Sequence, residues 1–146
     1  MNGEIYFKRK IYNKLVEWKK TSNGTTALLI EGAWRIGKST IAEQFAKNEY
    51  EEYILIDFNV ASIEIKNLFI YERNDIDLIL QKLQLFYGKV LPVRKSVIIF
   101  DEVQFCPEAR SLIKYLVADG RYDYLETGSL ISIKKNVQNI IIPSEE

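Results

Sequence analysis

Two hydrophobic periodicities alternate along this chain. Short apolar runs typical of strands are followed by longer segments in which apolar residues recur every three or four positions, as on one face of a helix. The pattern predicts strands at 27–31, 53–58, 96–100 and 122–127, and a fifth at 139–142. It predicts helices within 6–20, 39–48, 76–87 and 109–117. Asn74 is the expected N-cap of the third helix, Gly88 ends that helix, and Gly120 ends the fourth.

This alternation predicts an α/β fold. Strands separated by helices form a parallel sheet through right-handed crossovers, so we expect about five parallel strands with helices on both faces. The run Ser96–Phe100 is continuously apolar after its serine, as in a strand buried on both sides. At 146 residues the chain has the length of one domain.

Composition excludes several kinds of chemistry. Twenty basic residues balance twenty acidic ones, so the chain lacks the overall positive field of a dedicated nucleic-acid binder. The sequence has no histidine, which excludes Ser-His-Asp and Cys-His catalysis and histidine metal ligation. Its single cysteine, Cys106, excludes an internal disulfide. Any reaction must therefore use carboxylates, Lys, Arg, hydroxyls and the backbone.

No targeting or membrane segment is predicted. Residues 1–20 are interrupted by charges every few positions, unlike a signal peptide. Apolar runs such as Val97–Phe100 are far shorter than the ~20 residues of a spanning helix. We expect a cytoplasmic protein with no membrane partner.

The strongest motif is a phosphate-binding loop between the first strand and the second helix. Residues 32–39 read Gly-Ala-Trp-Arg-Ile-Gly-Lys-Ser and fit G-x-x-x-x-G-K-[ST]. Gly32 and Gly37 allow backbone N–H groups to turn toward phosphate, and the following helix directs its positive end to the same anion. Lys38 is expected at the β- and γ-phosphates and Ser39 on Mg²⁺. The complete set of expected nucleotide-binding residues is Gly32, Ala33, Trp34, Arg35, Ile36, Gly37, Lys38, Ser39 and Thr40.

A pair of carboxylates follows the third strand. Adjacent like charges at the end of an apolar strand repel each other, and a metal ion would relieve that repulsion. We expect Asp101 to hold Mg²⁺ through its water shell, and Glu102 to polarise an attacking water as general base. Ligands of open α/β sheets bind outside the carboxyl ends of the strands, where Ser39 and Asp101 both fall.

The fourth strand ends in Thr127-Gly128-Ser129. Ser129 is predicted to hydrogen-bond the attacking water, and the alternative is a turn that it caps. Arg35, Arg110 and Arg121 could each contact phosphate, although a surface role is the commoner one for a single arginine.

The three motifs together resemble AAA-type ATPases of bacteria and archaea that carry a C-terminal domain of unknown function. The resemblance rests on ALLIEGAWRIGKST, SVIIFDEVQ and YLETGSL and covers about residues 6 to 133. It implies a Walker A loop at Gly32, Gly37, Lys38, Ser39 and Thr40, Walker B at Asp101 and Glu102, and a sensor-1 position at Ser129. Gln104 matches the family's glutamine after the acidic pair.

The chain departs from that family in two ways. Trp34 stands where the family usually has arginine, and the Gly-Arg pair that follows the strand-end motif is missing. We expect 1–146 to be a nucleotide-binding core, with 6–24 as a helix and turn and 25–146 as the αβα fold, truncated before the lid and C-terminal domain.

Two functions remain open at this stage. One is Mg²⁺-dependent hydrolysis of ATP to ADP and phosphate by Glu102, Lys38 and Ser129, coupled to movement of an attached domain. The other is a nucleotide-gated binding module with little or no hydrolysis. A phosphotransferase is weaker, because Glu102 beside Asp101 favours activation of water. The sequence leaves open a protein or nucleic-acid partner of the missing part, and a homo-oligomer.

Overall fold

The computed structural model describes residues 2–32, 37–129 and 137–142. Within them the elements are α1 (Asn2–Ser22), β1 (Ala27–Gly32), α2 (Lys38–Glu49), β2 (Glu52–Asp57), α3 (Ile63–Tyr71), α4 (Ile76–Tyr87), β3 (Ser96–Asp101), the 3₁₀ helix η2 (Val103–Phe105), α5 (Pro107–Asp119), β4 (Asp123–Gly128) and β5 (Val137–Ile142). Of the helices that the structure describes, none has the length and apolar character needed to span a bilayer.

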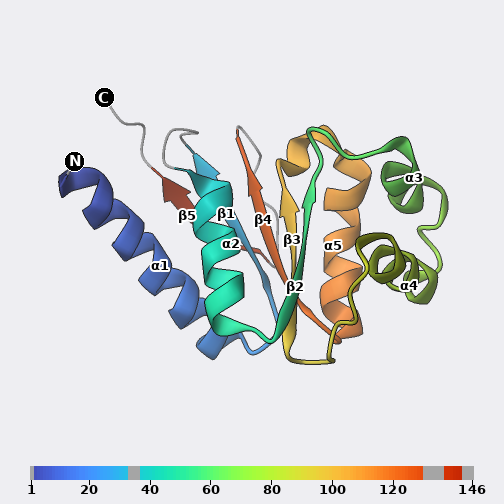
Figure 1. The fold of residues 1–146 in the computed structure, drawn as a ribbon, viewed down its shortest axis with the longest axis horizontal. Helices are drawn as coiled ribbons and strands as arrows, with labels where there is room; N and C mark the ends of the chain where they lie inside the picture. The colour runs from blue at the N-terminus through green and yellow to red at the C-terminus, as the bar shows by residue number, and fades with distance from the viewer. Residues whose placement is uncertain (1, 33–36, 130–136, 143–146) are drawn as a thin grey trace.

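The strands form one parallel sheet in the order β2-β3-β4-β1-β5. Figure 1 shows α1 and α2 on one side of it and α3, α4 and α5 on the other. The chain crosses from β1 to β2 in one direction and returns through β3 to β4 in the opposite one. Right-handed crossovers of opposite direction place their helices on opposite faces. The predicted α/β class is confirmed.

Each face of the sheet has its own apolar core, because successive strand residues point to opposite sides. In β1, Leu28 and Ile30 pack toward α1 and α2, whereas Ala27 and Leu29 pack toward α3, α4 and α5. All six residues of β3 are buried, as its apolar run predicts.

Two features near α3 and α4 differ from the sequence prediction. The helix α3 is not predicted, because Ile63-Glu64-Ile65-Lys66 alternates apolar and polar residues as a strand does. The predicted N-cap Asn74 is wrong by one residue. Asp75 is the N-cap of α4, and its carboxylate accepts a hydrogen bond from the Leu78 amide at 3.0 Å.

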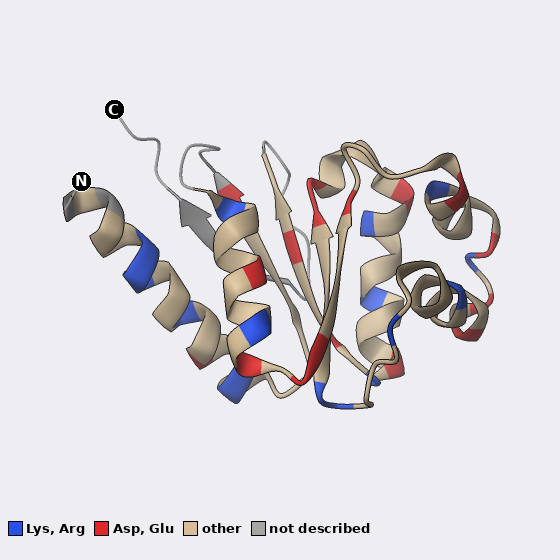
Figure 2. Cartoon of the chain, in the orientation of Figure 1, with Lys and Arg blue, Asp and Glu red and all other residues tan. Residues whose placement is uncertain are grey.

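The sheet order brings three functional segments to one edge. β4 lies between β1 and β3, so the carboxyl ends of these three strands are neighbours. The loop after β1 leads into α2, and the turn after β3 leads into η2. Figure 2 shows a basic segment at the start of α2 and acidic segments at the carboxyl ends of neighbouring strands. This edge therefore combines positive and negative charge.

Candidate functional site

The N-terminus of α2 forms the first side of the site. Gly37 is its N-cap and has the left-handed torsions φ 76° and ψ 52°, which side chains of L-residues resist. Its carbonyl accepts the hydrogen bond of the Ile41 amide at 3.1 Å and so closes the first turn. Lys38 follows and is buried, with 3% of its surface exposed. A buried lysine beside helix amides that have no carbonyl partner within the helix concentrates positive charge where an anion could bind.

A hydrogen bond joins this helix to the end of β3. The Ser39 hydroxyl donates to Oδ1 of Asp101 at 2.6 Å. The Thr127 hydroxyl, from β4, donates to the same oxygen at 2.5 Å. The structure thus brings together Ser39 and Asp101, the two residues predicted as metal ligands, and adds Thr127, to which the sequence analysis gave no role.

Glu102 is held at its backbone and at its side chain. It has a left-handed φ of 55°, rare for a residue with a side chain. Its amide donates to Oγ1 of Thr127 at 3.0 Å, and its carboxylate accepts a hydrogen bond from Nε2 of Gln104 at 2.9 Å. These contacts hold the carboxylate at the strand end rather than free in solvent.

Burial raises the pKa of Asp101 above the ordinary range of an aspartate. The hydrogen bonds from Ser39 and Thr127 act in the opposite direction, while the charges of Asp57 and Glu102 raise the pKa further. Asp57 ends β2 and pairs in register with Asp101. The sequence analysis missed Asp57, although it follows an apolar strand just as Asp101 does. The negative charges of Asp57 and Glu102 thus act on Asp101, and a cation bound to Asp101 would offset them.

The donor atoms fit Mg²⁺. Ser39 offers a hydroxyl and Asp101 a carboxylate, and Mg²⁺ prefers a few oxygen ligands with the rest of its shell made of water and phosphate. Among the residues described, no group of three His, Cys, Asp or Glu side chains forms a complete protein cage for a metal. A site with one carboxylate and one hydroxyl matches the open type of coordination that Mg²⁺ adopts with nucleotides.

The other predicted site residues have different outcomes. Ala33, Trp34, Arg35 and Ile36 lie outside the described residues. Gly32 ends β1, and Thr40 is exposed on α2. Ser129 is half-buried and makes no hydrogen bond to any described residue, so its predicted role stays a prediction. Alternation along β4 places Thr127 on the same face as Leu125, toward α2, which is the signal that could have identified it.

Two of the candidate arginines form ion pairs with carboxylates. Nε of Arg110 is 3.4 Å from Oε1 of Glu126, a residue 1% exposed on the opposite face of β4 from Thr127. Arg121 precedes the amino end of β4 and pairs with Asp119 at 2.9 Å. Arg121 therefore lies at the opposite end of β4 from Thr127.

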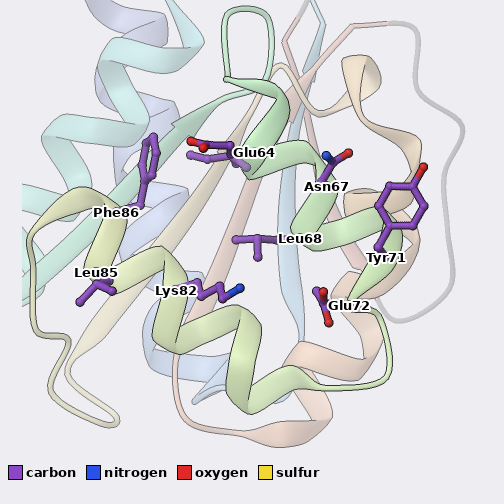
Figure 3. Close-up of a pocket in the computed structure, with 9 residues that line it drawn as sticks. Glu64, Asn67, Leu68, Tyr71, Glu72, Lys82, Leu85 and Phe86 are labelled. Carbon is purple, nitrogen blue, oxygen red and sulfur yellow. The ribbon is translucent and has the colours of Figure 1, made fainter.

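A separate groove of about 660 Å³ lies between α3 and α4. Figure 3 shows Phe86, Leu85 and Lys82 on one wall and Glu64 and Tyr71 on the other. Neither the acidic pair nor the start of α2 lines this groove, so we keep it distinct from the candidate site.

Comparison with known proteins identifies a family that the chain matches. The model of a family described as an AAA domain matches residues 24–141. No match is found among the curated proteins. The solved structure of PCH-2 from C. elegans superposes on 91% of this chain and 41% of its own, with 14% identity and a TM-score of 0.49. The chain therefore spans about two fifths of the length of that structure.

Proposed function

This chain belongs to the AAA domain family, and from that membership and its site geometry we propose that it binds ATP with Mg²⁺ and hydrolyses it to ADP and phosphate. One observation carries the proposal. Ser39, at the start of α2, donates a 2.6 Å hydrogen bond to Asp101, at the end of β3. This contact supports the proposal that the start of α2 and the acidic end of β3 belong to one site.

Lys38 and the helix amides would bind the phosphates. The lysine is buried at the first position of α2, where the amides of the first turn have no carbonyl partner within the helix. Its ammonium charge would add to the partial positive charge of the helix end. We therefore assign the β- and γ-phosphates to this side of the site.

Ser39 and Asp101 would hold the metal, Ser39 through its hydroxyl oxygen and Asp101 through a water of the metal shell. When bound, Mg²⁺ would neutralise charge on the phosphate oxygens. Ser39 can keep donating its hydrogen to Asp101, because a hydroxyl oxygen has further lone pairs. This division supports Asp101 and Ser39 as the metal-binding pair.

Glu102 would act as the general base. Its carboxylate lies one residue beyond Asp101 and is held by Gln104 at 2.9 Å. A positioned carboxylate can accept a proton from an attacking water. Ser129, half-buried beyond the end of β4, is proposed to contact the same water.

A nucleotide-gated binding module with slow hydrolysis is the second candidate. The observation that favours it concerns the arginines: within the described residues, Arg110 and Arg121 form ion pairs with the carboxylates of Glu126 and Asp119. An arginine that stabilises the transition state typically increases turnover by ~10³–10⁵. A nucleotide would then set a conformation that an attached domain reads. The attached domain is itself a proposal, which rests on the resemblance to ATPases with a C-terminal domain of unknown function.

Thermal unfolding tests nucleotide binding. At 100 times Kd, Mg-ADP should stabilise the folded chain by about 2.7 kcal/mol, which raises the Tm by several degrees for a chain of this size. Lys38→Ala should remove that shift. Lys47→Ala is the matched control, because Lys47 is an exposed lysine in the last turn of the same helix. An equal shift in Lys38→Ala and wild type would place the nucleotide elsewhere.

A further inference from the structure

Thr127 lies between the two members of the acidic pair. It is fully buried in β4, and its hydroxyl contacts the Asp101 side chain and the Glu102 backbone. We propose that Thr127 is a positioning residue that couples the metal-binding carboxylate to the general base. The inference rests on the proposed function, because it assigns Asp101 and Glu102 those roles.

The directions of the hydrogen bonds are fixed by chemistry. The Glu102 amide can only donate, so Oγ1 of Thr127 accepts that bond at 3.0 Å. The hydroxyl's one hydrogen is then committed to Oδ1 of Asp101, which can only accept while ionised. Ser39 donates to that same oxygen. Oδ1 is thus occupied by two hydroxyls, and the described residues leave Oδ2 of Asp101 without a donor and available for metal-bound water.

The same hydroxyl supports an uncommon backbone conformation. A residue with a side chain in the left-handed region costs ~1–2 kcal/mol, and Glu102 has a φ of 55°. The bond from its amide to Thr127 helps to hold that conformation, which sets the direction of the Glu102 side chain. Because threonine is β-branched, its χ1 rotation is restricted. A displacement of the Asp101 carboxylate therefore breaks or moves the bond that holds Glu102.

Valine and serine separate this role from simple packing. Thr127→Val keeps the branched shape and removes both hydrogen bonds, whereas Thr127→Ser keeps the hydroxyl and loses a methyl. If Thr127 only filled space, the serine variant would be the more damaged of the two. In the positioning role, the valine variant loses the coupling and the serine variant retains it.

The first measurement needs no nucleotide. Hydrogen exchange of the Glu102 amide, followed by NMR in the nucleotide-free chain, should be at least ~10-fold faster in Thr127→Val and near wild type in Thr127→Ser, since only the serine retains an acceptor for that amide. Thr21→Val is the control, because Thr21 is an exposed threonine on α1 whose hydroxyl bonds to Glu17. If Thr127→Val does not fold, Thr127→Ala removes the same hydroxyl without the apolar methyl that valine adds.

The second measurement is the Mg²⁺ dependence of ADP binding. Loss of a group that orients a metal ligand typically weakens metal affinity 10–100-fold. We expect the Mg²⁺ concentration for half-maximal ADP binding to rise by about that factor in Thr127→Val and to recover in Thr127→Ser. An unchanged Mg²⁺ dependence in Thr127→Val, or equal Glu102 exchange in both variants, would overturn the inference. A wild-type chain that binds no ADP would instead refute the proposed function, while the exchange comparison would still test the contact between Thr127 and Glu102.

Discussion

The hydroxyl of Ser39 lies 2.6 Å from Oδ1 of Asp101, although 62 positions separate the two residues in the chain. This contact joins the start of α2, which follows β1, to the end of β3. In the sheet β3 is separated from β1 by β4. Glu102 follows Asp101 directly, so the proposed general base lies next to the proposed metal-binding pair, Ser39 and Asp101. The neighbouring carboxylates should therefore have separable roles.

Asp101→Asn and Glu102→Gln should have different effects. Asp101→Asn should weaken Mg²⁺ binding at the proposed metal site, so ADP binding should lose most of its Mg²⁺ dependence. Glu102→Gln removes the proton acceptor, so it should retain Mg-ATP binding and lower turnover by ~10² or more. Calorimetric titration with and without Mg²⁺, together with phosphate release, measures both effects. Equal loss of binding in the two variants would show that the roles are not divided in this way.

Turnover by the 146-residue chain should be slow. In the described part of the site, Lys38 is the basic side chain that remains to neutralise developing charge, because Arg110 and Arg121 pair elsewhere. P-loop enzymes that lack their arginine in trans turn over below ~10⁻² s⁻¹. Steady-state phosphate release should fall in that range. A rate of ~1 s⁻¹ or more with no partner added would require a further cation, with Arg35 as the first candidate to substitute.

Gly37→Ala should affect both folding and binding. The left-handed φ of 76° at this N-cap costs an alanine ~1–2 kcal/mol, and any shift of the backbone would move the amides of the proposed phosphate site. Gly88→Ala is the matched control. Gly88 has a φ of 65° and open space where the alanine methyl would lie, but it ends α4 away from the site. Urea unfolding should show similar losses in stability, whereas ADP binding should fall only in Gly37→Ala.

Gln104→Leu should reduce turnover without weakening nucleotide binding. Gln104 donates to the Glu102 carboxylate, and a hydrogen bond to a charged group contributes ~1.5–3 kcal/mol. We expect kcat to fall by about 10-fold or more and Kd for ADP to stay constant. Gln81→Leu, an exposed change on α4, is the control. A rise in Kd that equals the fall in kcat would show that Gln104 supports the nucleotide rather than the base.

The Arg110–Glu126 ion pair should contribute to the stability of the folded chain. Breaking a buried ion pair leaves an uncompensated charge and costs ~3–5 kcal/mol, and both side chains are at most 9% exposed. Arg110→Met should therefore destabilise the fold strongly, and Arg110→Met combined with Glu126→Leu should recover most of the loss. Arg121→Ala, which removes a pair near the surface, should cost at most about 1 kcal/mol. Denaturant unfolding of the wild type, Arg110→Met, Glu126→Leu and the double variant gives the coupling energy of the pair, and a negligible value would contradict this assignment.

Local sequence patterns predicted most of the sheet. They also predicted that Ser39, after the loop, and Asp101 lie together at the carboxyl ends of the strands. Strong apolar runs marked β1 to β4, and the Gly-Lys-Ser segment marked the start of α2. The helix α3 escaped prediction because its first four residues alternate, even though Ile65, Leu68 and Phe69 bury one helical face. The sequence pattern could not show that Thr127, rather than Ser129, contacts the acidic pair. That contact depends on β4 lying beside β3 in the sheet. The pairing of Asp57 with Asp101 depends on the same non-local arrangement of strands.

The strand order also determines when the site can exist as the chain folds. β1 and β3 are joined only through β4, the last of the three in the sequence. Each pairing in the sheet is parallel and links segments far apart in the chain, an arrangement that forms slowly because distant segments must meet before they gain stability. Ser39, Asp101 and Thr127 are therefore assembled only once β4 has entered between its neighbours. A ligand that requires all three recognises β1, β4 and β3 once they are paired, so its binding reports the assembly of these three strands rather than the presence of the loop.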